Sequence, residues 1–218
     1  MIGVIRVFTT DNTDILQQHG NVITKIYQVP TMNKCIPDQP LGIFDDATEQ
    51  IAVPKIVQLG RELEQEGCNI LAISCAADPA IKELRQAVSI PVIGAGSAAA
   101  LTALAIGEPV GVLGITETPP TVVEQQLGTL LVGNRRPEGV TNTTDLLTPA
   151  GQEKAVEAAK KLVKEGAKVI LFACTGFSTI GLAAVLRKEL NVPIIDAVEA
   201  EGMLASALYK QMVPANVE

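Results

Sequence analysis

Aromatic residues make up only 3% of this 218-residue chain, and tryptophan is absent. The core must therefore be built from aliphatic side chains, as in parallel β-sheets that are covered by helices. Histidine occurs once, at His19, and no cysteine pair has the Cys-x-x-Cys spacing. Zinc sites draw on several histidines or on clustered cysteines, so the sequence predicts no metal site.

Positive charge is also scarce, because 17 Lys and Arg stand against 24 Asp and Glu, for a net charge of −7. Without a basic run, we expect neither nucleic acid nor an anionic membrane as a partner. The uncharged stretch 86–107 contains Pro91 and three glycines, which favours strand, loop and buried helix over a membrane span. No signal peptide and no disulfide framework are visible, which is typical of a reduced, cytoplasmic protein.

Short β-branched runs alternate with longer helical patterns along the chain, which predicts an α/β fold with parallel sheets. The expected strands are 3–8, 69–74, 91–93, 110–115, 169–173 and 193–195. The expected helices are 48–66, 79–88, 98–106, 153–165, 179–190 and 197–210. The polar, proline-rich stretches 116–121 and 135–149 are predicted to be loops or connections between lobes.

The second half of the chain repeats the first. Residues 63–75 align without a gap with 162–174, and each copy has a glycine C-cap, an apolar run and then a cysteine. Downstream, 90–94 aligns with 192–196. A period near 100 residues is too long for a solenoid and indicates two similar lobes.

We expect both lobes to be parallel-sheet α/β units related by internal duplication, with the active site in the cleft between them. The first lobe is predicted to comprise 1–97 plus 198–218, and the second 98–197.

The duplication gives Cys75 and Cys174 equivalent positions at the ends of two apolar strands. Ligands of open parallel sheets bind beyond these strand ends, so both thiols are expected to face one cleft. Nearby helix N-termini are expected to lower a thiol pKa from ~8.5 towards neutrality. A thiolate and a thiol on opposite faces of a carbon acid can invert it without a cofactor, while backbone amides stabilise the enolate.

The residues around the two cysteines resemble the Asp/Glu/hydantoin racemase superfamily over essentially the whole chain. The resemblance rests on Ser74-Cys75-Ala-Ala-Asp78-Pro79, Ala173-Cys174-Thr175-Gly176-Phe177, Gly94-Ala-Gly96-Ser-Ala-Ala and Pro-Ile-Ile-Asp196. It implies two α/β lobes, cofactor-independent racemisation or epimerisation by the two cysteines, and amides and hydroxyls after each cysteine that bind substrate oxygens.

Within that superfamily, Cys75-x-x-Asp78-Pro79 is more similar to hydantoin racemases than to glutamate racemases. The latter carry Cys-Asn-Thr and Cys-Thr-His, where this chain has Cys-Ala-Ala and Cys-Thr-Gly. The chain also departs from hydantoin racemases, with Thr9-Thr10-Asp11 for Asn-Pro-Asn and Gly94-Ala-Gly96-Ser97 for Gly-Ile-Gly-Glu. The small-molecule substrate is therefore left open between a hydantoin, allantoin and a free amino acid.

Further site residues are predicted on both lobes. Asp78 is expected to cap the helix that Pro79 begins and additionally to orient the Cys75 loop. Asp196 either supports Cys174 or, as we prefer, caps the last helix. Glu199 and Glu201 are expected to be solvated. The substrate-binding candidates are Thr9, Ala76, Ala77, Thr116, Thr175 and Gly176.

Two other function classes compete with the racemase. The Gly94-Ala-Gly96-Ser stretch resembles a dinucleotide fingerprint, as in a nicotinamide-dependent oxidoreductase, although it lies in mid-chain after a very short strand. A non-catalytic two-lobe sensor of small molecules is the other alternative. Cys35 and Cys68 have no repeat partner and are interpreted as small hydrophobic residues. The alanine-rich helices are compatible with a homo-oligomer, but they identify no interface.

Overall fold

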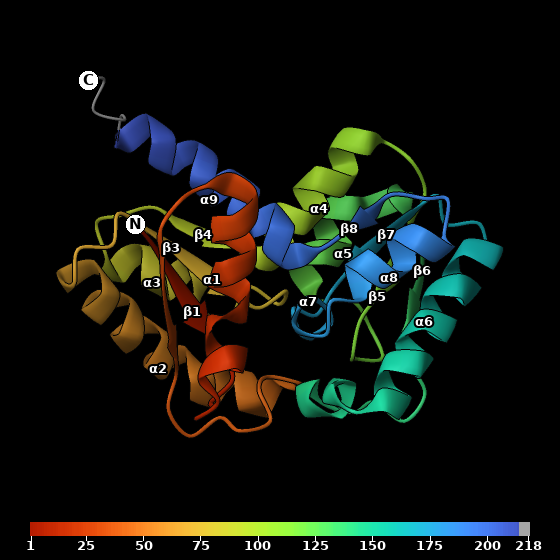
Figure 1. The fold of residues 1–218 in the computed structure, drawn as a ribbon, viewed down its shortest axis with the longest axis horizontal. Coiled ribbons are helices and arrows are strands. Elements are labelled where there is room, and N and C mark those ends of the chain that lie inside the picture. Colours follow the sequence, from red (N-terminus) through yellow and green to blue (C-terminus); the bar gives the residue numbers. More distant parts are fainter. Residues whose placement is uncertain (214–218) are drawn as a thin grey trace.

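The computed structural model describes residues 1–213 and contains two four-stranded parallel sheets with the same strand order. The first sheet runs β2-β1-β3-β4, and the second runs β6-β5-β7-β8. The two sheets lie in opposite halves of the molecule (Figure 1). The first comprises β1 (Ile2–Arg6), β2 (Thr31–Cys35), β3 (Ile70–Ser74) and β4 (Val92–Gly94). The second comprises β5 (Val110–Leu113), β6 (Leu131–Arg135), β7 (Val169–Phe172) and β8 (Ile194–Ile195). The predicted α/β fold is confirmed.

Nine α-helices lie between or after the strands of the described chain. They are α1 (Thr13–Tyr27), α2 (Asp46–Gln65), α3 (Ile81–Ala87), α4 (Ala95–Ile106), α5 (Thr121–Leu127), α6 (Pro149–Lys164), α7 (Gly176–Thr179), α8 (Leu182–Glu189) and α9 (Ala197–Met212). Each of the six expected strands and six expected helices is present, with ends that differ by a few residues. The expected helix 179–190 is split, because Gly181 adopts a left-handed conformation between α7 and α8.

The sequence interpretation missed α1, β2, α5 and β6. Both missed strands are edge strands of their sheets and are only partly buried, so their sequences lack the continuous apolar runs of central strands. The stretch 135–149 is also not entirely loop, because a 3₁₀ helix occupies Thr143–Leu147.

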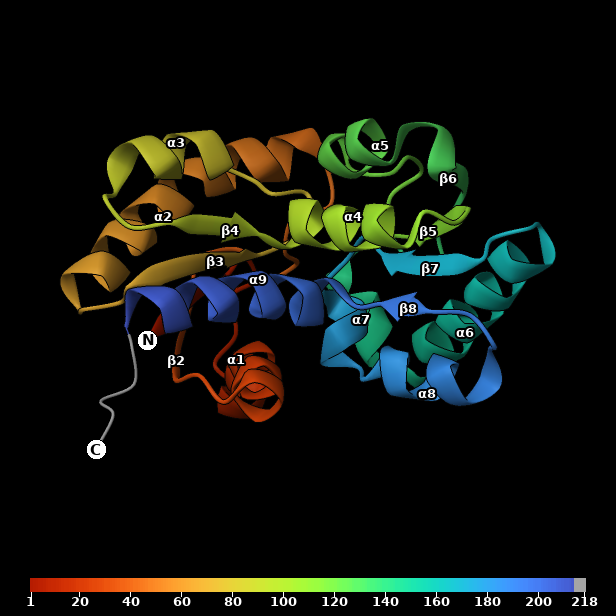
Figure 2. The ribbon, with the colours of Figure 1, turned by 90° about the horizontal axis from the view of Figure 1, so that it is seen from above.

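Helices α4 and α9 cross between the two halves of the molecule (Figure 2). Helix α4 follows β4 of the first sheet but packs on α5 and β7, whereas α9 follows β8 of the second sheet but packs on α1 and β3. Their small, buried alanines allow this close packing. The lobe boundaries 1–97 plus 198–218 and 98–197 stay a prediction, and residues 214–218 lie outside the described residues.

The core is aliphatic on both sides of each sheet, and its only aromatic pair in the described chain is Phe172 with Phe177, whose ring centres are 5.3 Å apart. One expectation about α9 is wrong. Glu201 is fully buried instead of solvated, and Glu199 is partly buried and paired with Arg187. Within residues 1–213, no helix has the length and apolar character needed to cross a membrane.

Candidate active site

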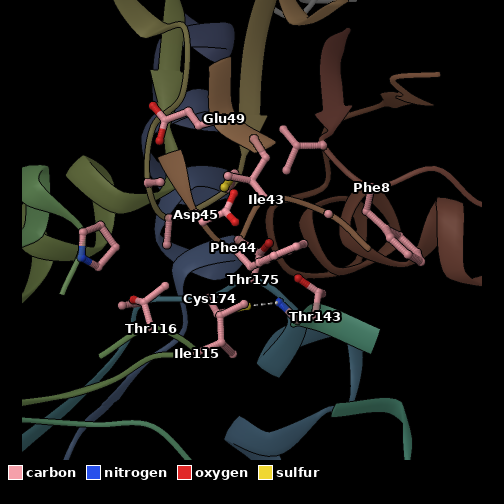
Figure 3. Close-up of a pocket in the computed structure, with 18 of the residues that line it drawn as sticks. Phe8, Ile43, Phe44, Asp45, Glu49, Ile115, Thr116, Thr143, Cys174 and Thr175 are labelled. Carbon is pink, nitrogen blue, oxygen red and sulfur yellow. Dashed lines mark hydrogen bonds between the residues drawn. The ribbon is translucent and has the colours of Figure 1, made fainter. Parts of the chain in front are cut away.

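A cavity of about 270 Å³ lies where the two Cys-containing loops meet (Figure 3). Cys75, Ala76 and Ala77 line it from the end of β3, and Cys174, Thr175 and Gly176 line it from the end of β7. Both loops lie at the carboxyl ends of parallel strands, where such sheets bind ligands. The structure therefore brings together the two thiols and the four residues that follow them.

Asp78 lies in the loop that follows Cys75, and its side chain ties this loop to α4. The carboxylate of Asp78 accepts hydrogen bonds from Gly96 N (2.7 Å), Ser97 N (2.9 Å) and Ser97 Oγ (2.5 Å), at the first turn of α4. The expected cap on the helix after Pro79 is wrong, because α3 begins after Ala80 without a side-chain cap. Asp78 itself has a positive φ of 52°, which turns its side chain towards α4.

The glycines of the Gly94-Ala-Gly96 stretch provide room for this contact. A Cβ on Gly94 would lie 2.3 Å from Asp78 Cγ, and one on Gly96 would lie 2.0 Å from the Ala76 carbonyl oxygen. In a dinucleotide site, the amides of this turn would bind pyrophosphate. Here Asp78 already occupies them, which argues against the oxidoreductase interpretation.

Cys174 is buried, and the first turn of α7 contacts its sulfur. The backbone N–H of Gly176 donates to Cys174 Sγ at 3.3 Å, and the hydroxyl of Thr143 also approaches the sulfur (Figure 3). Thr143 comes from the 3₁₀ helix that was predicted to be a loop. It has no counterpart in the repeat, so no sequence signal marked it.

The ionisation of the two thiols differs from the sequence expectation. Burial raises the pKa of Cys174 to about 11, although the N–H of Gly176 and the hydroxyl of Thr143 act in the opposite direction. Burial also raises the pKa of Cys75, and the neighbouring Cys174, Asp78 and Glu49 raise it further. The N–H of Ala77 lowers this pKa, but by less than burial raises it. The expected lowering is wrong because α7 is a single turn and α3 begins well after Cys75, so desolvation dominates.

The predicted threonines have different environments. Thr116 lines the cavity and donates from Oγ1 to the Thr118 carbonyl at 2.6 Å. Thr175 also lines it, but its hydroxyl donates to the Ser74 carbonyl at 3.0 Å. Thr9 does not line the cavity, because its hydroxyl is held in the loop after β1 by Ile36 O and Gln39 N.

Asp196 has the structural role that we preferred. Its carboxylate caps α9 by accepting from Val198 N at 2.9 Å and from Glu199 N at 3.3 Å. It also accepts from Ser178 Oγ at 2.5 Å, which joins this cap to the helical turn after Cys174. Among residues 1–213, no group of three or more His, Cys, Asp or Glu side chains is arranged to hold a metal ion.

The sequence interpretation missed the acidic side of the cavity. Asp45, Asp46 and Glu49 line it from the start of α2, and burial raises the pKa of Glu49 (Figure 3). Arg6 is the one basic residue among the described lining residues, and its guanidinium is turned away to the carbonyl of Ile15 at 2.6 Å. These residues lie outside the repeated motifs, which explains why pattern comparison did not identify them.

Comparison with known proteins agrees with this geometry. The family model described as "Asp/Glu/Hydantoin racemase" matches residues 28–203. The chain belongs to this family. A hydantoin racemase from Rhizobium meliloti is 30% identical over 179 residues, which cover 78% of this chain and 73% of that protein.

Two solved structures share the fold. An allantoin racemase from Klebsiella pneumoniae superposes with a TM-score of 0.79 and 23% identity, over 97% of this chain and 88% of that one. An allantoin racemase from Pseudomonas fluorescens superposes with a TM-score of 0.80 and 19% identity, over 97% of this chain and 92% of that one. The family membership makes this protein a racemase, an isomerase that acts on a small molecule.

Proposed function

We propose that the protein is a cofactor-independent racemase or epimerase of a hydantoin-type cyclic ureide, with Cys75 and Cys174 as opposed acid and base. The observation that carries this proposal is that two thiols from equivalent strand ends of two sheets line one cavity. A planar substrate between them would present one face to each thiol, which is the arrangement that inversion requires.

In the proposed reaction, one cysteine is a thiolate and removes the proton from the stereocentre. The electron pair of the broken C–H bond moves onto the adjacent carbonyl oxygen and forms an enolate. Ala76 lines the cavity, and its backbone N–H is suited to stabilise this oxygen, whereas the N–H of Ala77 contacts the Cys75 sulfur. The opposite thiol then donates its proton to the other face, and the two cysteines exchange protonation states.

The contacts of Cys174 support its role as the first base when the cavity is empty. The Gly176 N–H and the Thr143 hydroxyl both favour a negative sulfur, and its pKa is raised less than that of Cys75. The carboxylates of Glu49 and Asp78 disfavour a second negative charge at Cys75. Cys75 is therefore the better proton donor at the start of a cycle.

The charge of the cavity wall favours a cyclic ureide over aspartate or glutamate. A dicarboxylate would place negative charge near Asp45, Asp46 and Glu49, with no available cation among the described lining residues. A hydantoin ring is neutral, and its N–H groups can donate to carboxylate oxygens. The name of the Rhizobium meliloti relative points to the same substrate class.

Proton NMR in D₂O tests this function directly. The purified protein is incubated with L-5-methylhydantoin, allantoin, L-aspartate and L-glutamate, and the non-enzymatic exchange is subtracted. We expect protein-dependent loss of the α-proton signal with a ureide and inversion of its configuration. Exchange of the amino acids alone would overturn the ureide assignment. Ligand-induced thermal stabilisation without any exchange would identify the non-catalytic sensor instead.

A further inference from the structure

A hydrogen-bonded network of largely buried polar side chains runs inward from the cavity wall, where Arg6 and Ser74 lie, and the proposed reaction does not use it. His19 of α1 is fully buried, and burial, followed by the charge of Arg6, lowers its pKa well below the usual value. His19 Nδ1 is 2.7 Å from Ser74 Oγ, and His19 Nε2 is 2.9 Å from Thr179 Oγ1. The neutral ring thus joins the residue before Cys75 to the last residue of α7.

One arrangement of donors gives every group in this network a partner, with the proton of the His19 ring on Nδ1. Arg6 can only donate, and its Nη2 lies 3.4 Å from Thr179 Oγ1. The Thr179 hydroxyl then donates to His19 Nε2, and His19 Nδ1–H donates to Ser74 Oγ. Ser74 Oγ donates to Glu201 Oε1 at 2.5 Å. Every ring nitrogen and hydroxyl between Arg6 and Glu201 is therefore satisfied in one direction.

This hydrogen-bonded network connects the two loops that carry the thiols. Ser74 ends β3 immediately before Cys75, whereas Thr179 ends α7, which follows Cys174. Two further contacts cross the same boundary: Thr175 Oγ1 donates to the Ser74 carbonyl at 3.0 Å, and Gln18 donates to the Thr179 carbonyl. A movement at His19 would shift one thiol loop relative to the other.

We propose that His19 is a positioning residue that, through Ser74 and Thr179, fixes the separation and orientation of Cys75 and Cys174. The inference rests on the proposed function only for its kinetic consequence. Inversion requires both thiols to reach the same carbon, whereas proton exchange with retention requires only one. Loosening the contact should therefore reduce inversion more than exchange.

The first test measures the thiol geometry without any substrate. The full-length protein is treated at pH 9 with 1,3-dichloroacetone, whose two chlorides are displaced by two thiolates, and the bridged Cys75–Cys174 peptides are quantified by mass spectrometry. We expect His19→Ala and Thr179→Val each to lower the bridging yield about fivefold, and their combination to lower it no further, because both interrupt one network. Thr179→Val is nearly isosteric, so it carries the test where His19→Ala fails to fold.

The matched control is Tyr27→Phe. Tyr27 also joins α1 to α9, by donating to the Glu199 carbonyl at 2.8 Å, but it does not line the cavity. This variant should bridge its cysteines as the wild type does. Wild-type bridging in Thr179→Val and His19→Ala would overturn the positioning role of His19. If iodoacetamide alkylates both thiols of the wild type at the same pH but no bridge forms, both this inference and the proposed function would be overturned.

The second test compares two rates with L-5-methylhydantoin and allantoin in D₂O. It measures the rate of α-deuterium exchange with retention of configuration, divided by the rate of inversion. A misplaced thiol should raise this ratio about tenfold, because small displacements are costly in catalysis. A smaller fraction of folded enzyme would slow both processes equally and leave the ratio unchanged. An unchanged ratio in active variants would contradict the inference. Wild-type protein that bridges its cysteines but exchanges no substrate would overturn the proposed function alone.

Discussion

The carboxylate of Asp78 accepts a hydrogen bond of 2.7 Å from the backbone N–H of Gly96. This contact joins the loop of Cys75 to the first turn of α4, the helix that crosses to the second sheet. The second half of the molecule contains a related contact with exchanged partners. There Asp196 lies at the helix start, and Ser178, in the turn after Cys174, donates to it. Each thiol loop is thus tied to the N-terminus of a crossing helix.

Removal of the Asp78 carboxylate should therefore affect both stability and catalysis. Asp78→Ala leaves the N–H groups of Gly96 and Ser97 without a partner, and we expect the free energy of unfolding in urea to fall by about 2 kcal/mol. We also expect kcat to fall about tenfold, because the Cys75 loop loses its anchor. Asn12→Ala removes the exposed cap of α1 and should lower stability without a change in kcat. Wild-type kcat in Asp78→Ala would contradict the anchoring role.

Replacement of either thiol should abolish racemisation. Cys75→Ser and Cys174→Ser each remove one of the two acid–base groups, so polarimetry should show a loss of at least about 10³-fold. Exchange of the α-proton should survive for the single enantiomer whose base remains, and the two variants should retain opposite enantiomers. The control variant is Cys35→Ser, because Cys35 does not line the cavity. Two single variants that both racemise at the wild-type rate would exclude the two-thiol mechanism.

The pH dependence of kcat/KM should follow the ionisation of the thiols. Burial raises the pKa of Cys174 to about 11, so the reactive thiolate is scarce at pH 7 and increases about tenfold per pH unit up to that pKa. Since kcat/KM reports the free enzyme, its logarithm should rise with a slope near one between about pH 7 and pH 10. A hydantoin methylated at the imide nitrogen ensures that only the enzyme titrates. A flat profile would show that neither thiol is the base.

The acidic wall should discriminate against anionic substituents. Glu49→Gln removes one negative charge from the cavity and should raise kcat/KM for L-5-carboxyethylhydantoin relative to L-5-propylhydantoin by roughly fivefold, which corresponds to about 1 kcal/mol. Salt should diminish the effect. Glu62→Gln makes the same charge change at a partly buried position of α2 that does not line the cavity, and it should leave the ratio unchanged. An unchanged ratio in Glu49→Gln would show that the 5-substituent of the hydantoin does not bind near Glu49.

The buried carboxyl of Glu201 should make stability depend on pH. Burial raises its pKa to about 8, above its ordinary value of 4.5. Between these values the folded state retains a proton that the unfolded state has lost, so stability falls as the pH rises from about 5 to about 8. Scanning calorimetry of Glu201→Gln, which keeps an acceptor for Ser74, should give a flatter profile and a higher Tm at pH 8 relative to wild type. Parallel profiles would contradict this linkage.

Local patterns predicted much of the fold because it is built from strongly periodic, buried elements. The apolar runs before Cys75 and Cys174 became β3 and β7, and Gly67 and Gly166, which follow α2 and α6, have the positive φ that favours glycine. The edge strands β2 and β6 escaped prediction because their residues are only partly buried and their sequences lack a continuous apolar run, whereas the edge strands β4 and β8 have short apolar runs.

The amino-acid sequence by itself determined the duplicated α/β architecture, the equivalence of Cys75 and Cys174, and the family. These features depend on residue type and spacing along the chain. Only the tertiary structure decided the partner of Asp78, the burial of Glu201, the link through His19 and the direction of both thiol pKa shifts. These features depend on contacts between residues distant in the chain and on the exclusion of water, and neither leaves a periodic signal in the sequence.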